Sequence, residues 1–167
     1  MFLRILSASI ICLGAATSSH ARLIEDWSYD RLLNTADVVV IATVIGNKEW
    51  TEPIELPLFA DALEGRLATF KVEAALKGKN PGDKIELIHC RLKEDVSVEN
   101  GPLLAEFRQK GRLLHIEAVD GVRGKRTEQE ATPQYILFLK ARTDGRFEPV
   151  AGQVDSSLSV RQVTSAE

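Results

Sequence analysis

The sequence predicts an all-β domain, mainly antiparallel, built as a small OB-like barrel or a sandwich of about six strands with one short N-terminal helix. Short apolar runs alternate with turn residues along most of the chain. β-Branched residues dominate two of these runs, as is usual for strands. No amphipathic stretch is long enough for the crossover helices of a doubly wound sheet, which excludes that fold class.

The first 21 residues are read as a signal peptide. Arg4 supplies a positive n-region, residues 5–16 form an apolar stretch, and residues 19–21 end in a small residue that suits a signal peptidase. This predicts a mature chain that starts at Arg22 and is exported, to the periplasm or beyond the cell. The apolar stretch has about 12 residues, whereas about 20 are needed to cross a bilayer, so no membrane span is expected in the mature chain.

Residues 22–167 are predicted to form a single β-rich domain. Without the first 21 of its 167 residues the chain keeps 146, which fits one domain with a core of its own. It then carries 24 acidic and 20 basic residues, a formal charge of −4 with histidines neutral. This balance gives no reason to expect a nucleic-acid partner.

The first predicted element is a short helix that Ser28 can cap. Trp27 precedes the cap and is placed to pack on Leu32. The apolar positions follow helical spacing at Tyr29, Leu32, Leu33 and Ala36.

Three strands are predicted next. Residues 37–45 are apolar at both alternating sets of positions, which indicates a central strand. Residues 67–76 alternate apolar with polar side chains and should have one wet face. The turn-rich residues 77–83 should then reverse the chain into a strand over 84–92, so that the two strands form a hairpin.

The second half of the chain is less regular. A strand is expected over residues 112–119, and the charged, glycine-containing residues 120–132 are read as a solvated loop. Residues 134–142 are the second run that is apolar on both faces. Asp144-Gly145 is a strong hairpin signal, and Pro149 favours a strand end in the returning residues 146–150. Residues 158–163 offer a last short strand.

Several of these segments together resemble a family of exported bacterial proteins of uncharacterised function. The resemblance spans most of residues 36–160. Its segments are Ala36-Asp-Val-Val-Val-Ile, Phe70-x-Val-x-x-x-Leu76-Lys-Gly78, Leu87-Ile-His-Cys-Arg-Leu92, Asn100-Gly-Pro102, Tyr135-Ile-Leu-Phe-Leu139, Asp144-Gly-Arg-Phe147 and Gly152-Gln-Val-Asp-x-x-Leu-Ser159.

By strand order and its Leu-Lys-Gly turn, the chain is also distantly similar to the OB-type barrels of netrin-like domains and the tissue inhibitors of metalloproteinases. In those inhibitors a free N-terminal cysteine chelates the target's zinc. Here Arg22 is the expected first residue and Cys90 is the single cysteine of the mature chain, so no cysteine pair exists and the inhibitory mechanism is not carried over.

Few residues suggest chemistry. The chain has no nucleophile elbow, no zinc-protease helix motif, no phosphate loop and no paired-cysteine spacing. His89, Cys90 and His115 are the soft metal ligands of the mature chain, but adjacent strand residues point to opposite faces, so His89 and Cys90 should not share a metal. We expect no cofactor, a buried unreactive Cys90 and a satisfied strand histidine at position 89.

His89 and Arg91 project from one face of the same predicted strand. A cationic pair on a barrel face could hold an anion. The alternative is that Arg91 pairs with a surface acid such as Glu73, and this alternative is favoured because such pairs are common.

The connection over residues 51–66 holds five large apolar residues, which is unusual for a loop. Such a loop packs as a lid or contacts a partner. With Trp50 at its entrance and Phe59 within it, this connection is the best candidate interaction surface. The candidate binding residues are therefore Trp50, Phe59, His89 and Arg91.

Two functions follow from this sequence. The first is an exported, non-catalytic binding or interaction module of the cell envelope, whose partner is an envelope protein, a peptide or a saccharide. The second is an extracytoplasmic hydrolase that uses His89 or His115 with distant acids, such as Asp61, Glu64, Asp95 or Glu99. A histidine and a carboxylate within hydrogen-bond reach in a pocket would favour the second.

Overall fold

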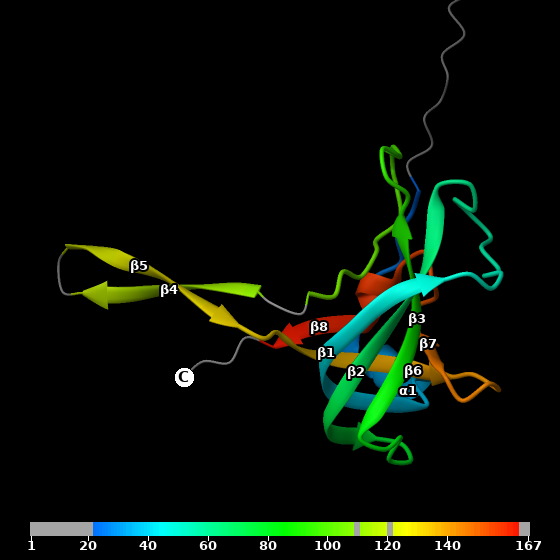
Figure 1. Ribbon diagram of the computed structural model, residues 1–167, viewed down its shortest axis with the longest axis horizontal. Coiled ribbons are helices and arrows are strands. Elements are labelled where there is room, and N and C mark those ends of the chain that lie inside the picture. Colours follow the sequence, from blue (N-terminus) through cyan, green and yellow to red (C-terminus); the bar gives the residue numbers. More distant parts are fainter. Residues whose placement is uncertain (1–21, 109–110, 120–121, 164–167) are drawn as a thin grey trace, which may run out of the picture.

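The computed structural model describes residues 22–108, 111–119 and 122–163 (Figure 1). Among these residues no helix has the length and apolar character needed to cross a bilayer. The elements in chain order are α1 (Tyr29–Thr35), β1 (Val38–Trp50), β2 (Leu63–Lys77), β3 (Lys84–Leu92), β4 (Gly111–Val119), β5 (Val122–Ala131), β6 (Gln134–Ala141), β7 (Phe147–Pro149), the 3₁₀ turn η1 (Ser156–Ser159) and β8 (Val160–Val163).

Five strands close into a mixed barrel. The order is β1-β2-β3-β7-β6, and β6 pairs again with β1. All neighbours are antiparallel except β3 and β7, which run parallel and pair through Leu87 and Phe147. The strand β8 lies outside this ring, on the edge of β6 that β7 leaves free. The predicted OB-like barrel is confirmed, and the sandwich alternative is wrong because β6 joins both ends of the sheet.

The strand β1 is central, as its two apolar faces predict. It pairs with β2 along one edge and with β6 along the other. Val40 and Val44 point into the barrel core, whereas Val39 packs on the other side against Leu32 of α1 and Phe138 of β6. The strand is longer than the predicted residues 37–45, and irregular pairing with β2 at three places bends it around the barrel.

The helix α1 begins and ends as its sequence dictates. Ser28 is the N-cap, and its hydroxyl accepts a hydrogen bond from the Arg31 amide at 3.2 Å. Leu32 is fully buried, with Trp27 packed against the same cluster. At the C-terminal end, the Lys77 ammonium donates to the carbonyls of Ala36, at 2.7 Å, and Leu33. A cation there also opposes the negative end of the helix dipole.

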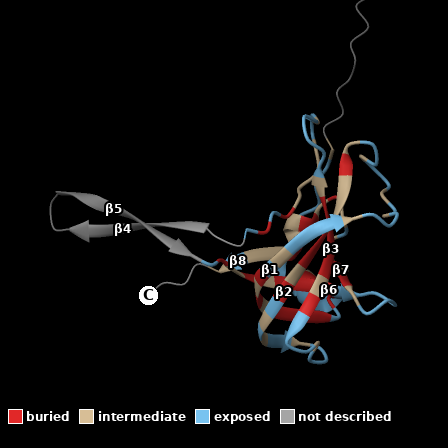
Figure 2. Cartoon of the chain, viewed as in Figure 1, coloured by how far each residue is buried: buried red, intermediate tan, exposed pale blue. Residues whose placement is uncertain are grey.

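Aromatic rings close one part of the barrel interior. The segment between β3 and β4 sends Ala105 and Phe107 into the core cluster. Phe107 meets the rings of Phe70 and Tyr135 edge to face, with centroids 4.9 and 5.4 Å away. The hydroxyl of Ser156 accepts the Ala105 amide at 2.9 Å. Figure 2 shows the buried residues gathered in these barrel strands. No periodic pattern predicts this packing, because only Ala105 and Phe107 of the segment enter the core cluster.

The solvated loop predicted over residues 120–132 is wrong. Its residues 122–131 form β5, which pairs antiparallel with β4 as a separate two-stranded sheet. Strand propensity depends strongly on context, so the polar composition that suggested a loop is compatible with a strand.

Three other boundaries differ from expectation. The connection expected over 51–66 ends at residue 62, because β2 begins at Leu63, which pairs with Leu92. Leu76, the last apolar residue of the alternating pattern over 67–76, is 55% exposed and lies beyond the end of the β2–β3 pairing at Lys71. The last predicted strand begins as a 3₁₀ turn and becomes β8 only at Val160.

The remaining predicted elements are confirmed. β3 covers the predicted residues 84–92 and forms the expected hairpin with β2. β6 lies between β1 on one edge and β7 and β8 on the other. At the Asp144-Gly145 turn, Gly145 has φ +83° and the Arg142 amide donates to the Arg146 carbonyl at 2.9 Å. Pro149 ends β7, as a residue without an amide hydrogen should.

Candidate functional site

Trp50 closes the end of β1 and lies against Gly65 of β2. A Cβ atom placed on Gly65 would stand 3.0 Å from Trp50 Cδ1 and 2.8 Å from Ile54 Cδ1, so only glycine allows both side chains this close. The loop over residues 51–62 therefore folds back onto β2 where it leaves β1. Ile54 thus holds the first part of the loop against β2.

The β6–β7 turn also reaches Trp50, because β7 pairs with β3. The Arg146 guanidinium stacks over the Trp50 ring, 4.5 Å from its centroid. Its Nε also donates to Glu86 Oε2 on β3, at 3.4 Å. We call the surface formed by Trp50, Glu86, Arg142, Asp144 and Arg146 the turn–loop face. It brings together residues of β1, β3 and the turn.

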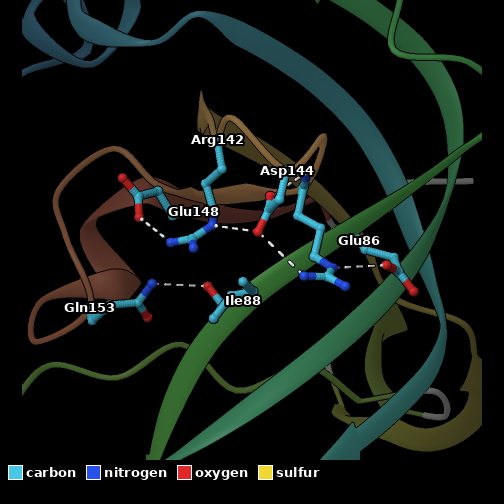
Figure 3. Close-up of polar contacts among 7 residues, drawn as sticks. Glu86, Ile88, Arg142, Asp144, Glu148 and Gln153 are labelled. Atoms are coloured by element: carbon cyan, nitrogen blue, oxygen red, sulfur yellow. Dashed lines mark hydrogen bonds and ion pairs between the residues drawn. The ribbon is translucent and has the colours of Figure 1, made fainter. Parts of the chain in front are cut away.

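Ion pairs hold the turn in place (Figure 3). Asp144 Oδ2 accepts from Arg142 Nε at 3.2 Å and from Arg146 Nη1 at 3.3 Å. Arg142 also reaches Glu148 Oε2 at 3.4 Å. The backbone amide of Arg146 is the main cause of a lowered pKa at Asp144, and the two guanidinium groups add to it. Solvent screens these exposed ion pairs, so the network orients side chains more than it stabilises the barrel.

A glutamine continues the short seam between β3 and β7. Gln153 Nε2 donates to the Ile88 carbonyl at 3.1 Å, next to the single residue pair that joins the two strands (Figure 3). Its Oε1 is buried without a hydrogen-bond partner among the described residues. The Gln153 side chain therefore adds a hydrogen bond to β3 where the backbone pairing between β3 and β7 is limited to one residue pair.

Phe59 lies at the far end of the loop from Trp50. It has φ +61°, and its carbonyl accepts from the amides of Ala62, at 2.9 Å, and Leu63, at 3.0 Å. The Arg22 guanidinium carbon lies 5.8 Å from its ring centroid. Phe59 therefore belongs to a different contact from the one that holds Trp50.

His89 is not the satisfied strand histidine that was expected. It is 3% exposed, and neither ring nitrogen has a hydrogen-bond partner in the described part of the chain. Its ring meets Phe107 edge to face at 4.9 Å. Burial lowers the pKa of His89 to about 4; the Cys90 backbone opposes this shift and the charge of Arg66 adds to it. His89 is therefore neutral at pH 7.

Arg91 pairs with a surface acid, as the favoured alternative predicted, but the acid is Glu64. The two residues are opposite each other on β3 and β2, and their side chains form an ion pair. Glu73 pairs instead with Lys71, at 3.1 Å. A neutral, buried His89 beside a paired Arg91 does not make the cationic pair that an anion would need.

Cys90 is fully buried, in line with its reading as a small hydrophobe. Burial raises the pKa of its thiol to about 11. Over the residues that the structure describes, no group of three or more histidine, cysteine, aspartate or glutamate side chains could hold a metal ion. His115 lies on β4, and its side chain is outside the described part.

Sequence reasoning found Trp50 but missed its partners. Arg142 and Arg146 flank the Asp144-Gly145 turn, and that turn was the available signal that both would project from one hairpin end. What the sequence lacked was the parallel β3–β7 pairing that sets this turn beside Trp50 and Glu86.

Comparison of the chain with protein-family models, curated proteins and solved structures finds no match.

Proposed function

We propose that this chain is an exported, non-catalytic binding module and that the turn–loop face contacts its ligand. The stacking of Arg146 on Trp50 carries the proposal, because it joins the end of β1, where the β1–β2 loop starts, to the β6–β7 turn beside β3. In OB-type barrels, ligands bind across the second and third strands between the loops that follow the first and fourth strands. In the ring order of this barrel, β6 and β7 take the places of the fourth and fifth strands.

The chemistry of this face suits an envelope saccharide or an extended peptide. It offers the flat ring of Trp50 together with arginine and carboxylate groups that can donate and accept hydrogen bonds. Opposite charges alternate along it, so it has no single sign that would select a polyanion. Export, inferred from the first 21 residues, places such ligands within reach.

Among the side chains that the structure describes, none favours the alternative hydrolase. Its clearest candidate, His89, is buried beside Phe107 and has no acid partner among the described residues. A general base must reach the proton that it abstracts, and a ring enclosed in the barrel core does not.

The test is a ligand screen with two variants of the face and one control. Residues 22–167 are screened against arrays of envelope oligosaccharides and of extended peptides. For each hit, Trp50→Ala and Arg146→Ala should weaken binding at least about tenfold, the loss expected for a central contact residue. Leu33→Ala, an exposed apolar residue on α1, is the control and should bind as the unmodified chain does. Hits that survive both face variants would place the binding surface elsewhere and contradict the proposal.

A further inference from the structure

Arg22 inserts its side chain among three segments that are far apart in the sequence. These are the β1–β2 loop at Phe59, the stretch after β3 at Gly101, and the stretch before η1 at Asp155. Each segment supplies one kind of group: an aromatic ring, a backbone carbonyl and a carboxylate. The three groups all belong to the barrel and its loops, so the site is complete without any other residue of the N-terminal segment.

The geometry selects a guanidinium group. Arg22 Nη1 and Nη2 donate to the two Asp155 carboxylate oxygens at 2.8 and 2.7 Å, and Nη2 also donates to the Gly101 carbonyl at 3.1 Å. The two side chains are 18% and 21% exposed. This bidentate pairing fits a planar fork, and an ammonium cannot reproduce it. The Arg22 hydrogen bond is also the main cause of a lowered pKa at Asp155.

Arg22 is held by its side chain and by little else. The four residues that follow it are exposed, Leu23 to 96%, and the described residues 22–27 make no backbone–backbone hydrogen bond with the barrel. Among the described residues, the buried Arg22 Nε has no hydrogen-bond partner, so this part of the chain leaves one donor of the guanidinium unsatisfied. The Arg22 side chain is attached through exposed residues and fits the site imperfectly. Another guanidinium group can therefore exchange with it.

We propose that Asp155, the Gly101 carbonyl and Phe59 form a guanidinium-binding site, that Arg22 fills it from within the chain, and that an arginine of a polypeptide partner can replace Arg22 there. This site is separate from the turn–loop face and does not depend on the function proposed for that face. A tethered occupant competes at an effective concentration in the millimolar range, so the site binds tightly only when Arg22 is withdrawn.

The experiment measures binding of N-acetyl-arginine-N-methylamide to the purified protein by NMR titration. Arg22→Ala should bind this probe at least about tenfold more tightly than the unmodified protein, since the tethered competitor is gone. The amides of Gly101 and Leu103 should shift, because the Gly101 carbonyl accepts a hydrogen bond from the occupant and the Leu103 amide donates to Asp155 Oδ1. Mass spectrometry of each variant checks that its N-terminus starts at the same position.

Two controls isolate the site. Arg31→Ala removes a different arginine, which stacks on Trp27, and should leave probe binding as in the unmodified protein. Adding Asp155→Asn to the Arg22→Ala variant should abolish binding. The corresponding lysine amide and free guanidinium ion serve as further probes: weaker binding of both supports recognition of an arginine side chain.

Equal binding of the lysine amide, or no gain in affinity in Arg22→Ala, would overturn the proposal. If Arg22→Ala does not fold, Arg22→Lys takes its place, because it keeps the charge but loses the fork, and the same gain is expected. Trp50→Ala should not change probe binding, so a failure of this site and a failure of the turn–loop face are told apart.

Discussion

Gly78 stands directly against the backbone of Asp37. A Cβ atom on Gly78 would lie 2.1 Å from the Asp37 carbonyl oxygen, and Gly78 has φ +83°. The turn between β2 and β3 is thereby packed on the residue that precedes β1. Asp37 is itself held in place, since its carboxylate accepts the Ala141 amide at 2.9 Å.

Gly78→Ala should therefore lower the free energy of unfolding by about 3 kcal/mol or more, from a left-handed backbone and a clash with backbone atoms. Gly82→Ala is the matched control. Gly82 has φ +94° in the same turn, but a Cβ there meets nothing within 4 Å, so it should cost only about 1 kcal/mol. Denaturant unfolding of both variants measures the difference, and equal losses would refute the backbone clash.

His89 should make the fold sensitive to mild acid. Its pKa is lowered by burial to about 4, whereas an unfolded histidine titrates near 6.5, so between these values the unfolded chain binds the extra proton. Stability is full above the unfolded pKa and falls as the pH drops from about 6.5 to 4, by about 3 kcal/mol in all.

The measurement is the free energy of unfolding across that range for the unmodified chain and for His89→Leu. Both proteins have the same carboxylates, so the difference between their curves is the contribution of His89 to the pH dependence. Parallel curves would show that His89 is not buried as a neutral group.

Cys90 should resist thiol reagents in the folded protein. Burial raises its pKa to about 11, from an ordinary value of 9.0, which leaves about a hundredfold less thiolate at pH 8. Labelling with Ellman's reagent should be slow in buffer and fast in denaturant. Rapid labelling in buffer, with the fold intact by circular dichroism, would place the thiol at the surface.

Trp50 and Arg146 should be energetically coupled. A double-mutant cycle with Trp50→Leu and Arg146→Met should give a coupling free energy of about 0.5 to 1 kcal/mol, typical of a partly exposed cation–π pair. Arg142→Met replaces Arg146→Met in the control cycle, because Arg142 contacts Asp144 and Glu148. Coupling below about 0.3 kcal/mol in the first cycle would mean that the stacking contributes nothing in solution.

Much of the barrel could be predicted from the sequence because its central strands are recognisable by their apolar residues. β1 and β6 are apolar on both faces, and both are enclosed: one face by the barrel core, the other by α1. Ser28, the Lys77–Asp83 turn and Gly145 mark where elements begin or reverse, through capping or positive φ.

The rest depends on contacts that leave no local pattern. Phe107 enters the core from an irregular segment, and β5 is a strand of mostly polar residues that pairs with β4 alone among the described strands. The candidate site was likewise predicted only in part. Trp50 was found as a large aromatic at a loop entrance, but its pairing with Arg146 joins residues nearly a hundred positions apart. His89 was expected to be satisfied, but its ring packs on Phe107 and its nitrogens have no hydrogen-bond partner among the described residues.

The parallel closure of the barrel also bears on how the chain folds. Leu87 and Phe147 are 60 residues apart, and they are the one residue pair that joins β3 to β7. The β2–β3 and β6–β7 hairpins join nearby residues and cost little loop entropy, so they should form early. The barrel then closes when the two preformed hairpins pair through β3 and β7. Mutations at this pairing should speed unfolding more than they slow folding.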